Sequence, residues 1–225
     1  MSETLLKVDN LGITFGGLKA VQKVNLYLNR GELIGLIGPN GAGKTTMFNM
    51  LTGVYAPTEG SIIFGGKSIA GLDPYKVTRQ GISRTFQNIR LFKELSVLDN
   101  VKVANHGLAK HNLLSSIFRL PSHFKGEAKM EEESLAFLKI FGLDVYKDEL
   151  AKNLPYGMQR RLEIARALAA GPKLLLLDEP AAGMNPQETH DLMELIAFIR
   201  KEFNLTILLI EHDMHLVMGI CERIY

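Results

Sequence analysis

The amino-terminal part of the chain carries short apolar or alternating runs that are separated by turn-forming residues. The runs are rich in β-branched and aromatic side chains and fall at residues 5–8, 13–15, 24–28 and 61–64. Turn sequences at residues 16–17 and 29–31 contain the glycines and the asparagine that favour tight reversals. Because no long helical gap lies between the runs, they predict an antiparallel β-layer.

A second kind of apolar segment is continuous rather than alternating. Such segments occur at residues 33–37, 82–86, 174–177 and 205–210. Continuous apolar runs of this length are typical of strands that are covered on both faces. We therefore expect these four segments to join in one parallel sheet.

Helical signals occupy the middle and the later part of the chain. Apolar residues at helical spacing predict helices at residues 45–51, 97–105, 125–141 and 157–170. Ser96 and Asp99 resemble a capping box, and Asn185 with Pro186 and Glu188 is a strong helix start. The pattern predicts an α/β fold with a helical insertion at about residues 91–155.

Composition narrows the class of protein without fixing its activity. Apolar residues make up 46% of the 225 residues and charged residues 22%, which excludes a disordered, collagen-like or coiled-coil chain. A formal net charge of +2 does not argue for nucleic-acid binding. Cys221 has no cysteine partner, no apolar run approaches the roughly 18 residues of a membrane-spanning helix, and the start lacks a signal-peptide pattern. We expect a soluble, cytosolic protein.

The run after the apolar segment 33–37 fits the phosphate-loop pattern G-x-x-x-x-G-K-[ST]. It comprises Gly38, Pro39, Asn40, Gly41, Ala42, Gly43, Lys44, Thr45 and Thr46. The glycines allow backbone N–H groups to surround a phosphate, and the helix that follows adds partial positive charge at its start. Lys44 is suited to neutralising β- and γ-phosphate oxygens, and the Thr45 hydroxyl to ligating Mg²⁺. A glycine-rich turn without function rarely has a strand and a helix on its two sides.

Two carboxylates follow the apolar segment 174–177. Asp178 is suited to holding Mg²⁺ through the water shell of the ion, and Glu179 is suited to polarising an attacking water. Acidic residues also follow strands as solvated or helix-capping groups, but the nearby phosphate loop favours the functional interpretation. Ligands bind at the carboxyl ends of parallel strands in such sheets.

His212 and Gln87 end two further predicted strands. His212 is placed to reach a γ-phosphate or the attacking water, although a lone histidine is more often structural. Gln87 can offer its carbonyl oxygen to Mg²⁺ or orient water, and it fits an ordinary polar strand end equally well.

The phosphate loop, Gln87, the acidic strand end and His212 follow one another in an order that resembles an ATP-binding cassette (ABC) ATPase. The resemblance covers the whole chain and includes a signature segment before the acidic strand, Leu154-Pro155-Tyr156-Gly157-Met158. Pro155, Tyr156 and Met158 depart from the family's Leu-Ser-Gly-Gly-Gln. In the family, the helix that starts here points at the γ-phosphate held by the opposite subunit.

The resemblance implies a P-loop NTPase (RecA-like) parallel-sheet core with an N-terminal antiparallel β layer and an inserted helical subdomain. Residues 1–225 would form a single domain, with the core at about residues 1–90 and 155–225. Residues 221–225 enter a further strand without a turn, so we expect the chain to be incomplete at its carboxyl end.

The resemblance also implies roles for single residues. Phe15 matches the aromatic residue that stacks on adenine, Gln87 the glutamine that links the γ-phosphate to the membrane subunit, and His212 the switch histidine. Asn185 lies in the loop that crosses the dimer interface, where many members have Asp. The implied cofactors are ATP, which becomes ADP after turnover, and Mg²⁺, bound by Thr45, Gln87 and Asp178.

More narrowly, the chain looks like an ATP-binding subunit of branched-chain amino-acid importers. The supporting segments are residues 15–21, 84–92, 156–166, 181–186 and 211–214. The implied partners are transmembrane permease subunits, a second ATP-binding subunit and, indirectly, a substrate-binding protein. Nucleic acid is not among them. Such a protein sits in the cytoplasm, peripheral at the inner face of the cell membrane.

Other interpretations remain open from the sequence. The ATPase of lipopolysaccharide export is the nearest competitor for the transported molecule, and a soluble ABC protein outside transport is a second. A P-loop kinase or GTPase is a third, although no Asn-Lys-x-Asp guanine reader is present. For the groove that receives the permease, the apolar candidates are Leu91, Phe92, Leu113, Leu114, Ile117 and Phe118. We expect most of them to be core, with Leu91 or Phe92 as the exceptions.

Overall fold

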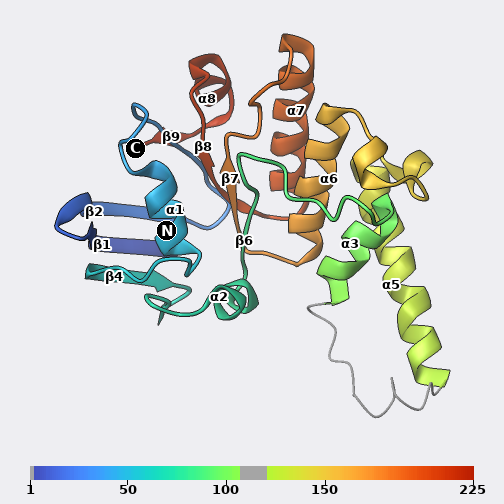
Figure 1. Cartoon of the computed structure of the whole chain (residues 1–225), viewed down its shortest axis with the longest axis horizontal. Helices are drawn as coiled ribbons and strands as arrows, with labels where there is room; N and C mark the ends of the chain where they lie inside the picture. Colours follow the sequence, from blue (N-terminus) through green and yellow to red (C-terminus); the bar gives the residue numbers. More distant parts are fainter. Residues whose placement is uncertain (1–2, 107–120) are drawn as a thin grey trace. The chain divides into compact units, whose positions relative to one another are not determined.

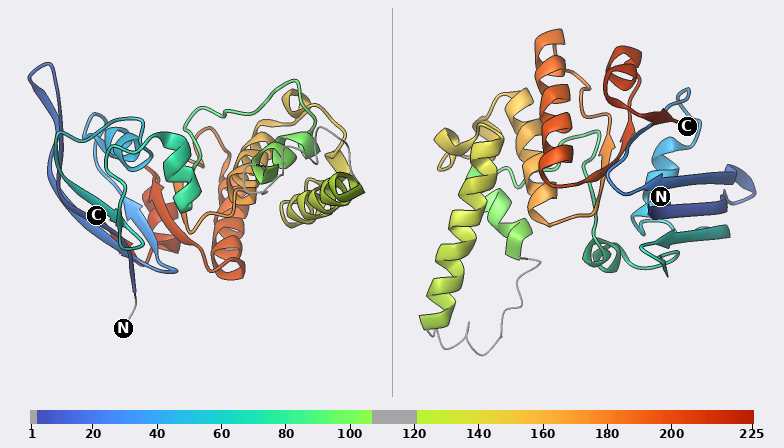
Figure 2. Two further views of the ribbon diagram at one scale, coloured as in Figure 1. Left: turned by 90° about the horizontal axis from the view of Figure 1, so that it is seen from below. Right: turned by 180° about the vertical axis from the view of Figure 1, so that it is seen from behind.

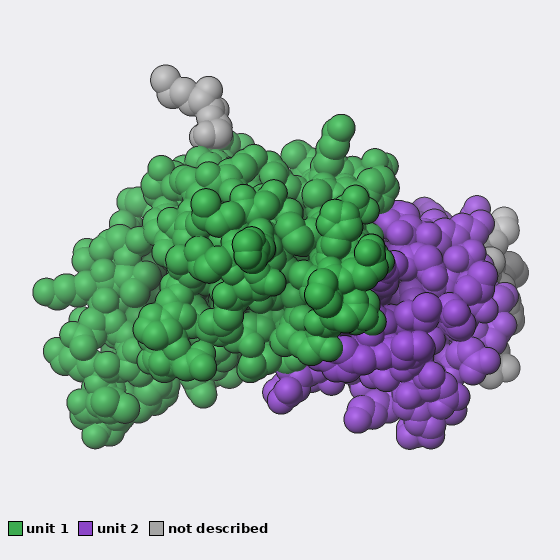
Figure 3. Space-filling model, turned by 90° about the horizontal axis from the view of Figure 1, so that it is seen from above, with its two compact units in different colours: residues 1–87, 172–225 green, residues 88–171 purple. Residues whose placement is uncertain are grey.

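A computed structural model describes residues 3–106 and 121–225 of the chain. The chain forms two compact units, which Figure 3 shows in different colours. Unit 1 comprises residues 1–87 and 172–225, and unit 2 comprises residues 88–171. The candidates Leu113, Leu114, Ile117 and Phe118 lie outside the described residues.

The predicted antiparallel layer is present in unit 1. It consists of β1 (Thr4–Phe15), β2 (Leu18–Asn29), β4 (Glu59–Phe64) and β5 (Lys67–Ser68), in the order β2-β1-β4-β5. Figure 2 shows β1, β2 and β4 side by side as one layer. The runs 5–8 and 13–15 belong to one strand, because an irregularity in the pairing between Val8 and Leu11 absorbs Asn10 in a left-handed conformation.

The second sheet of unit 1 is parallel, as the continuous apolar runs predicted. Its order is β6 (Ile82–Arg84), β7 (Leu174–Asp178), β8 (Thr206–Ile210), β3 (Leu33–Leu36) and β9 (Arg223–Ile224). Every residue of β7 and β8 is buried. Because the strands are parallel, their carboxyl ends share one edge of the sheet. Residues 37, 85, 179 and 211 therefore begin loops at the same edge.

Four helices of unit 1 are described. They are α1 (Lys44–Leu51), α2 (Pro74–Gln80), α7 (Pro186–Glu202) and α8 (Met214–Ile220). The predicted start of α7 is confirmed: Asn185 Oδ1 accepts the Glu188 N–H and Glu188 Oε2 accepts the Asn185 N–H, each at 2.9 Å. This capping box satisfies two backbone donors that a helix start leaves unpaired.

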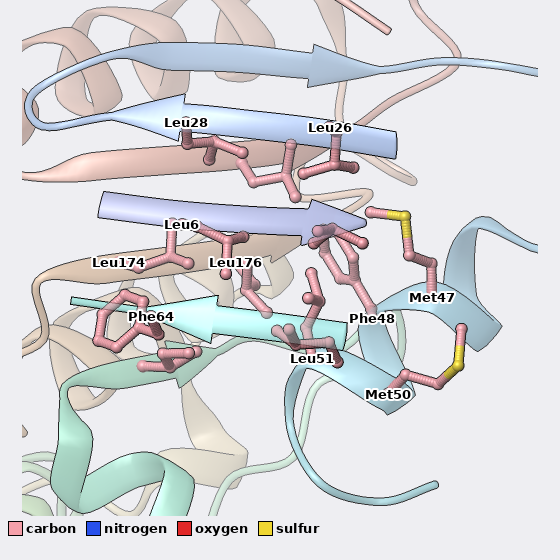
Figure 4. Packing of buried hydrophobic residues seen from close by; sticks show 14 of the residues in the cluster. Leu6, Leu26, Leu28, Met47, Phe48, Met50, Leu51, Phe64, Leu174 and Leu176 are labelled. Carbon is pink, nitrogen blue, oxygen red and sulfur yellow. The ribbon is translucent and has the colours of Figure 1, made fainter. Parts of the chain in front are cut away.

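Helix α1 supplies the centre of the hydrophobic core. Its Met47, Phe48, Met50 and Leu51 are buried and pack with residues of both sheets. Figure 4 shows Phe48 and Leu51 close to strand residues of the β-layer, with Leu174 and Leu176 of the parallel sheet in the same cluster. Burial of this face fixes the helix, and with it the loop that precedes the helix.

Unit 2 is helical, as predicted for the insertion. It contains α3 (Val97–His106), α5 (Pro121–Ile140), α6 (Tyr156–Ala169) and the 3₁₀ turns η1 (Asp144–Tyr146) and η2 (Ala151–Asn153). Helix α6 belongs to this unit. It is anchored there by contacts with α3 and α5, and Glu163 on α6 accepts the Arg90 N–H at 3.1 Å. The helix predicted at residues 125–141 is present as α5, which the structure describes from Pro121.

Crossing a membrane would require a longer and more apolar helix than any in residues 3–106 and 121–225.

The core packing of α1 generates the first prediction. Phe48→Ala removes a ring with 0% exposure and should lower the free energy of unfolding by about 3–5 kcal/mol, because a cavity remains. Urea unfolding followed by circular dichroism measures it. Phe198→Ala on α7, where the ring is 49% exposed, is the control and should change stability by less than about 1 kcal/mol. Equal losses in the two variants would contradict the packing.

Candidate active site

The phosphate-loop motif occupies the structural position that its pattern requires. Strand β3 ends at Leu36, residues 38–43 form the loop, and α1 begins at Lys44. Gly41 and Gly43 have φ of 82° and 87°, a region that favours glycine. A Cβ at Gly43 would also lie 2.9 Å from the Ala20 carbonyl oxygen. The glycines therefore serve both the turn and a close backbone approach.

Lys44 folds back over its own loop. Its Nζ donates to the Gly38 oxygen at 2.7 Å and to the Pro39 oxygen at 3.0 Å, and the residue is 9% exposed. The ammonium group is thus held beside the unpaired N–H groups at the start of α1. Both carry positive charge, so the loop is suited to binding an anion.

A cavity of about 530 Å³ opens over this loop in unit 1. Its lining residues are Leu18, Lys19, Ala20, Asn40, Gly41, Ala42, Gly43, Lys44, Thr45, Thr46, Gln87, Glu179 and His212. The structure therefore brings the phosphate loop together with three strand-end residues that the sequence singled out. Gly38 and Pro39 belong to the same loop and contact Lys44.

Glu179 is the meeting point of the strand-end residues. Its Oε1 lies 2.8 Å from His212 Nε2, and its Oε2 accepts a hydrogen bond from Gln87 Nε2 at 2.6 Å. Glu179 has φ of 47°, which is uncommon for a residue with a side chain and is favoured only where neighbours enforce it. The Glu179 N–H donates to the Ile210 oxygen at 2.9 Å and supplies part of that enforcement.

Asp178 is buried beneath this group and is paired with a residue that the sequence analysis missed. Its Oδ2 accepts from Arg84 at 2.6 Å, and both side chains are at most 5% exposed. Arg84 also donates to Asn49 Oδ1 at 2.6 Å. The guanidinium lies 5.4 Å and 5.0 Å from the ring centres of Phe48 and Phe86. A basic residue at the end of a buried strand was the available signal.

Glu211 is the second residue that the sequence analysis missed. It is 4% exposed, and its carboxylate accepts the N–H groups of Ala181 at 2.8 Å and of His212 at 3.1 Å. Burial raises the pKa of Glu211 above its usual value, and the backbone hydrogen bonds oppose this rise. Its place directly after an apolar strand, like that of Asp178, was the signal.

Phe15 is not among the described residues that line the cavity. The ring is 43% exposed at the end of β1 and makes an edge-on contact with Tyr55 at 5.2 Å between ring centres. The partial exposure leaves one side of the ring available for stacking.

The signature segment lies in unit 2 and begins α6. Leu154 is buried, Pro155 is the N-cap residue without a side-chain hydrogen bond, and Tyr156 is 46% exposed. Gly157 and Met158 are partly buried in the first turn. Because Pro155 offers no capping hydroxyl, the first N–H groups of α6 keep their hydrogen-bonding capacity for another acceptor.

Of the apolar groove candidates in the described part of unit 2, Phe92 is 48% exposed and Leu91 is partly buried. The Phe92 ring lies 5.3 Å from the Arg166 guanidinium. The guanidinium therefore packs over one face of the Phe92 ring.

The strand–loop–helix arrangement at the carboxyl ends of a parallel sheet, with the partly buried carboxylate of Glu179 in the same cavity, defines a P-loop nucleotide-binding protein. Comparisons with known proteins narrow the class. The sequence profile of the family described as "ABC transporter" matches residues 21–182. The chain belongs to the ABC transporter family, and the fold expected from the resemblance is confirmed.

Two relatives carry the name "High-affinity branched-chain amino acid transport ATP-binding protein". LivG of Escherichia coli K12 is 50% identical over 225 residues, which are 100% of this chain and 88% of LivG. BraF of Pseudomonas aeruginosa is 49% identical over 224 residues, again 100% and 88% of the two chains. The "Lipopolysaccharide export system ATP-binding protein LptB" of Escherichia coli K12 is more distant, with 34% identity over 98% of this chain and 85% of LptB.

Solved structures agree with the fold. The ADP conformation of MJ1267, an ATP-binding cassette of an ABC transporter, has a TM-score of 0.84 at 30% identity and covers 100% of this chain and 87% of its own. A dimeric post-hydrolysis structure of the cassette MJ0796 bound to ADP and Pi has a TM-score of 0.80 at 25% identity, with 98% and 93% covered.

The buried Arg84–Asp178 pair generates the second prediction. Arg84→Met removes the counter-charge of a buried carboxylate and should lower the free energy of unfolding by about 3–5 kcal/mol. Chemical unfolding without nucleotide measures it. Arg79→Met on α2, an exposed arginine, is the matched control and should be close to neutral. A stability for Arg84→Met that equals the control's would show that the pair contributes nothing.

Proposed function

We propose that the chain is the ATP-hydrolysing subunit of a membrane importer for branched-chain amino acids. The observation that carries the proposal is the meeting of Glu179, His212 and Gln87 at the rim of the phosphate cavity. Relatives at 50% and 49% identity, both named for branched-chain amino acid transport, give the transported class. The export ATPase LptB is less similar and supports the alternative less well.

The phosphate tail of ATP binds over residues 38–46. Backbone N–H groups of the loop and of the start of α1 donate to the β-phosphate, and Lys44 neutralises β- and γ-oxygens. Lys44 Nζ now bonds two loop carbonyl oxygens, so the ammonium group is already held over the cavity when the phosphates arrive. Phe15 offers its exposed ring face to the adenine.

The donor set fits Mg²⁺. Thr45 and Gln87, which carry a hydroxyl and an amide oxygen, line the cavity. Asp178 is buried and does not line the cavity, so we propose that it would hold the ion through the water shell of the ion. No group of three or more His, Cys, Asp or Glu side chains in the described residues is arranged to hold a metal ion by itself. Few protein oxygens combined with phosphate oxygens are the usual mode for Mg²⁺. The ion would supply neutralisation of charge on the β- and γ-phosphates.

Glu179 is the base for the attacking water. Its carboxylate faces the cavity, where it accepts a proton from water directed at the γ-phosphate. His212 fixes one carboxylate oxygen, and Gln87 fixes the other. Each contact uses a flexible side chain, so entry of a phosphate can exchange them for contacts with the γ-phosphate.

Hydrolysis is coupled to movement through partner subunits. A second ATP-binding subunit would close over the nucleotide with Leu154, Pro155, Tyr156, Gly157, Met158 and Asn185 in trans. The start of α6 has the open N–H groups that such a contact needs, although Pro155 lacks the family's serine hydroxyl. The relative MJ0796 is described as dimeric with ADP and Pi.

The membrane partners are transmembrane permease subunits, served indirectly by a substrate-binding protein. The chain would sit at the cytoplasmic face as a peripheral subunit and form one ABC ATPase domain with a helical subdomain. Closure of two such subunits around ATP changes the equilibrium between two permease orientations. Exposed Phe92 is the candidate contact for a permease helix.

The third prediction tests the site. Glu179→Gln should retain ATP binding within about threefold and lose more than about 99% of turnover, because an amide accepts no proton. Lys44→Ala should weaken ATP binding about tenfold or more, because a charge-assisted contact is lost. Calorimetric titration and phosphate release measure the two effects. Full turnover by the Gln variant would remove Glu179 from the mechanism.

The fourth prediction tests the partner surface. Phe92→Ser should reduce co-purification with the permease subunits several-fold, since an exposed aromatic anchor is lost, while ATP binding stays unchanged. Phe198→Ser on the exposed side of α7 is the control. Undiminished recovery of the membrane complex with Phe92→Ser would refute the assignment of this contact.

A further inference from the structure

We propose that Glu211 is a positioning residue, whose buried carboxylate ties the backbone of His212 to the segment after Glu179 and so fixes the contact between the two side chains. This inference rests on the proposed function, because it concerns the residue that orients Glu179 and His212. Glu211 itself does not line the phosphate cavity.

The geometry consists of two hydrogen bonds from one carboxylate to two loops. Oε1 accepts the Ala181 N–H at 2.8 Å, two residues after Glu179. Oε2 accepts the His212 N–H at 3.1 Å, in the loop that follows β8. Together with the 2.8 Å contact between Glu179 and His212, these bonds close a ring that joins the ends of β7 and β8.

The ring matters because the Glu179 backbone is strained. A side-chain-bearing residue at φ of 47° is maintained by its surroundings and relaxes when they loosen. The Glu179 N–H is bonded to the Ile210 oxygen, and the Ala181 N–H, two residues later, is bonded to the Glu211 carboxylate. Loss of Glu211 would free both the 181 segment and the His212 backbone.

The burial of Glu211 argues against its being an ordinary solvent-exposed strand end. A carboxylate that merely ended a strand in solvent would be exposed, whereas Glu211 is 4% exposed. Backbone N–H groups of Ala181, His212 and Asp213 face it, which compensates the cost of desolvating a charge. A buried acid whose partners are all backbone donors of two functional loops serves to place those loops.

The test compares Glu211→Gln and Glu211→Ala with the exposed control Glu202→Gln on α7. Gln keeps one acceptor oxygen and presents an NH₂ group to the other N–H, so kcat should fall about tenfold, the factor for one typical hydrogen bond. Ala should lower kcat further. The KM for ATP should stay within twofold in both, since residues 38–46 are untouched. Unchanged kcat in Glu211→Gln would overturn the inference.

A double variant separates positioning from a general structural role. In a His212→Ala background, Glu211→Gln should lower kcat clearly less than in the wild type, because one of the two groups it positions is already absent. A full additional tenfold loss would show that Glu211 acts elsewhere and would overturn the proposal.

A measurement without nucleotide keeps the inference distinct from the proposed function. The NMR signals of the His212 ring in the folded protein should shift and broaden in Glu211→Gln and stay unchanged in Glu202→Gln. If the wild type binds no ATP while the His212 signals respond, the function fails and the positioning role survives. If ATP is hydrolysed while the His212 signals are insensitive to Glu211, the positioning role fails alone.

Discussion

Three carboxylates follow two adjacent strands of the parallel sheet, and their mutual repulsion is the constraint on which the site depends. Asp178 and Glu179 end β7, and Glu211 follows β8. Each carboxylate is stabilised by a different kind of interaction. Arg84 neutralises Asp178, backbone N–H groups surround Glu211, and Glu179 alone faces the cavity with His212 and Gln87. Glu179 is thus the one of the three whose partners are flexible side chains at the cavity, which is why we assign it to the attacking water.

The phosphate loop supplies the opposite charge across the same cavity. Lys44 and the start of α1 are positive, and the loop geometry needs glycine at positions 41 and 43. The packing of Phe48 against both sheets fixes α1 and hence the loop. In the proposed function, a triphosphate would complete this arrangement, with its negative charge facing the loop and its terminal phosphate directed toward Glu179. Helix α1 thus connects the hydrophobic core, through Phe48, to the positively charged phosphate loop at its start.

The sequence predicted those parts whose cause is local. The phosphate loop depends on glycines and a lysine at fixed spacing, the α7 start on Asn185 and Glu188, and the parallel strands on continuous apolar runs. The structure shows all three where they were expected. The joining of two runs into β1 was missed, because the irregularity at Asn10 arises from pairing with β2. The roles of Arg84 and Glu211 also depend on contacts between distant parts of the chain. Arg84 bonds Asp178, 94 residues away, and Glu211 bonds Ala181, 30 residues away, so the sequence did not predict either role.

A crystal structure of the Glu179→Gln variant with ATP and Mg²⁺ would test the different roles assigned to the three carboxylates. We expect the triphosphate over residues 38–46, its γ-phosphate between Lys44 and residue 179, and the Arg84–Asp178 pair intact beneath it. Nucleotide bound elsewhere would contradict the role proposed for Glu179. Arg84 turned away from an unpaired Asp178 would contradict the role proposed for the Arg84–Asp178 pair.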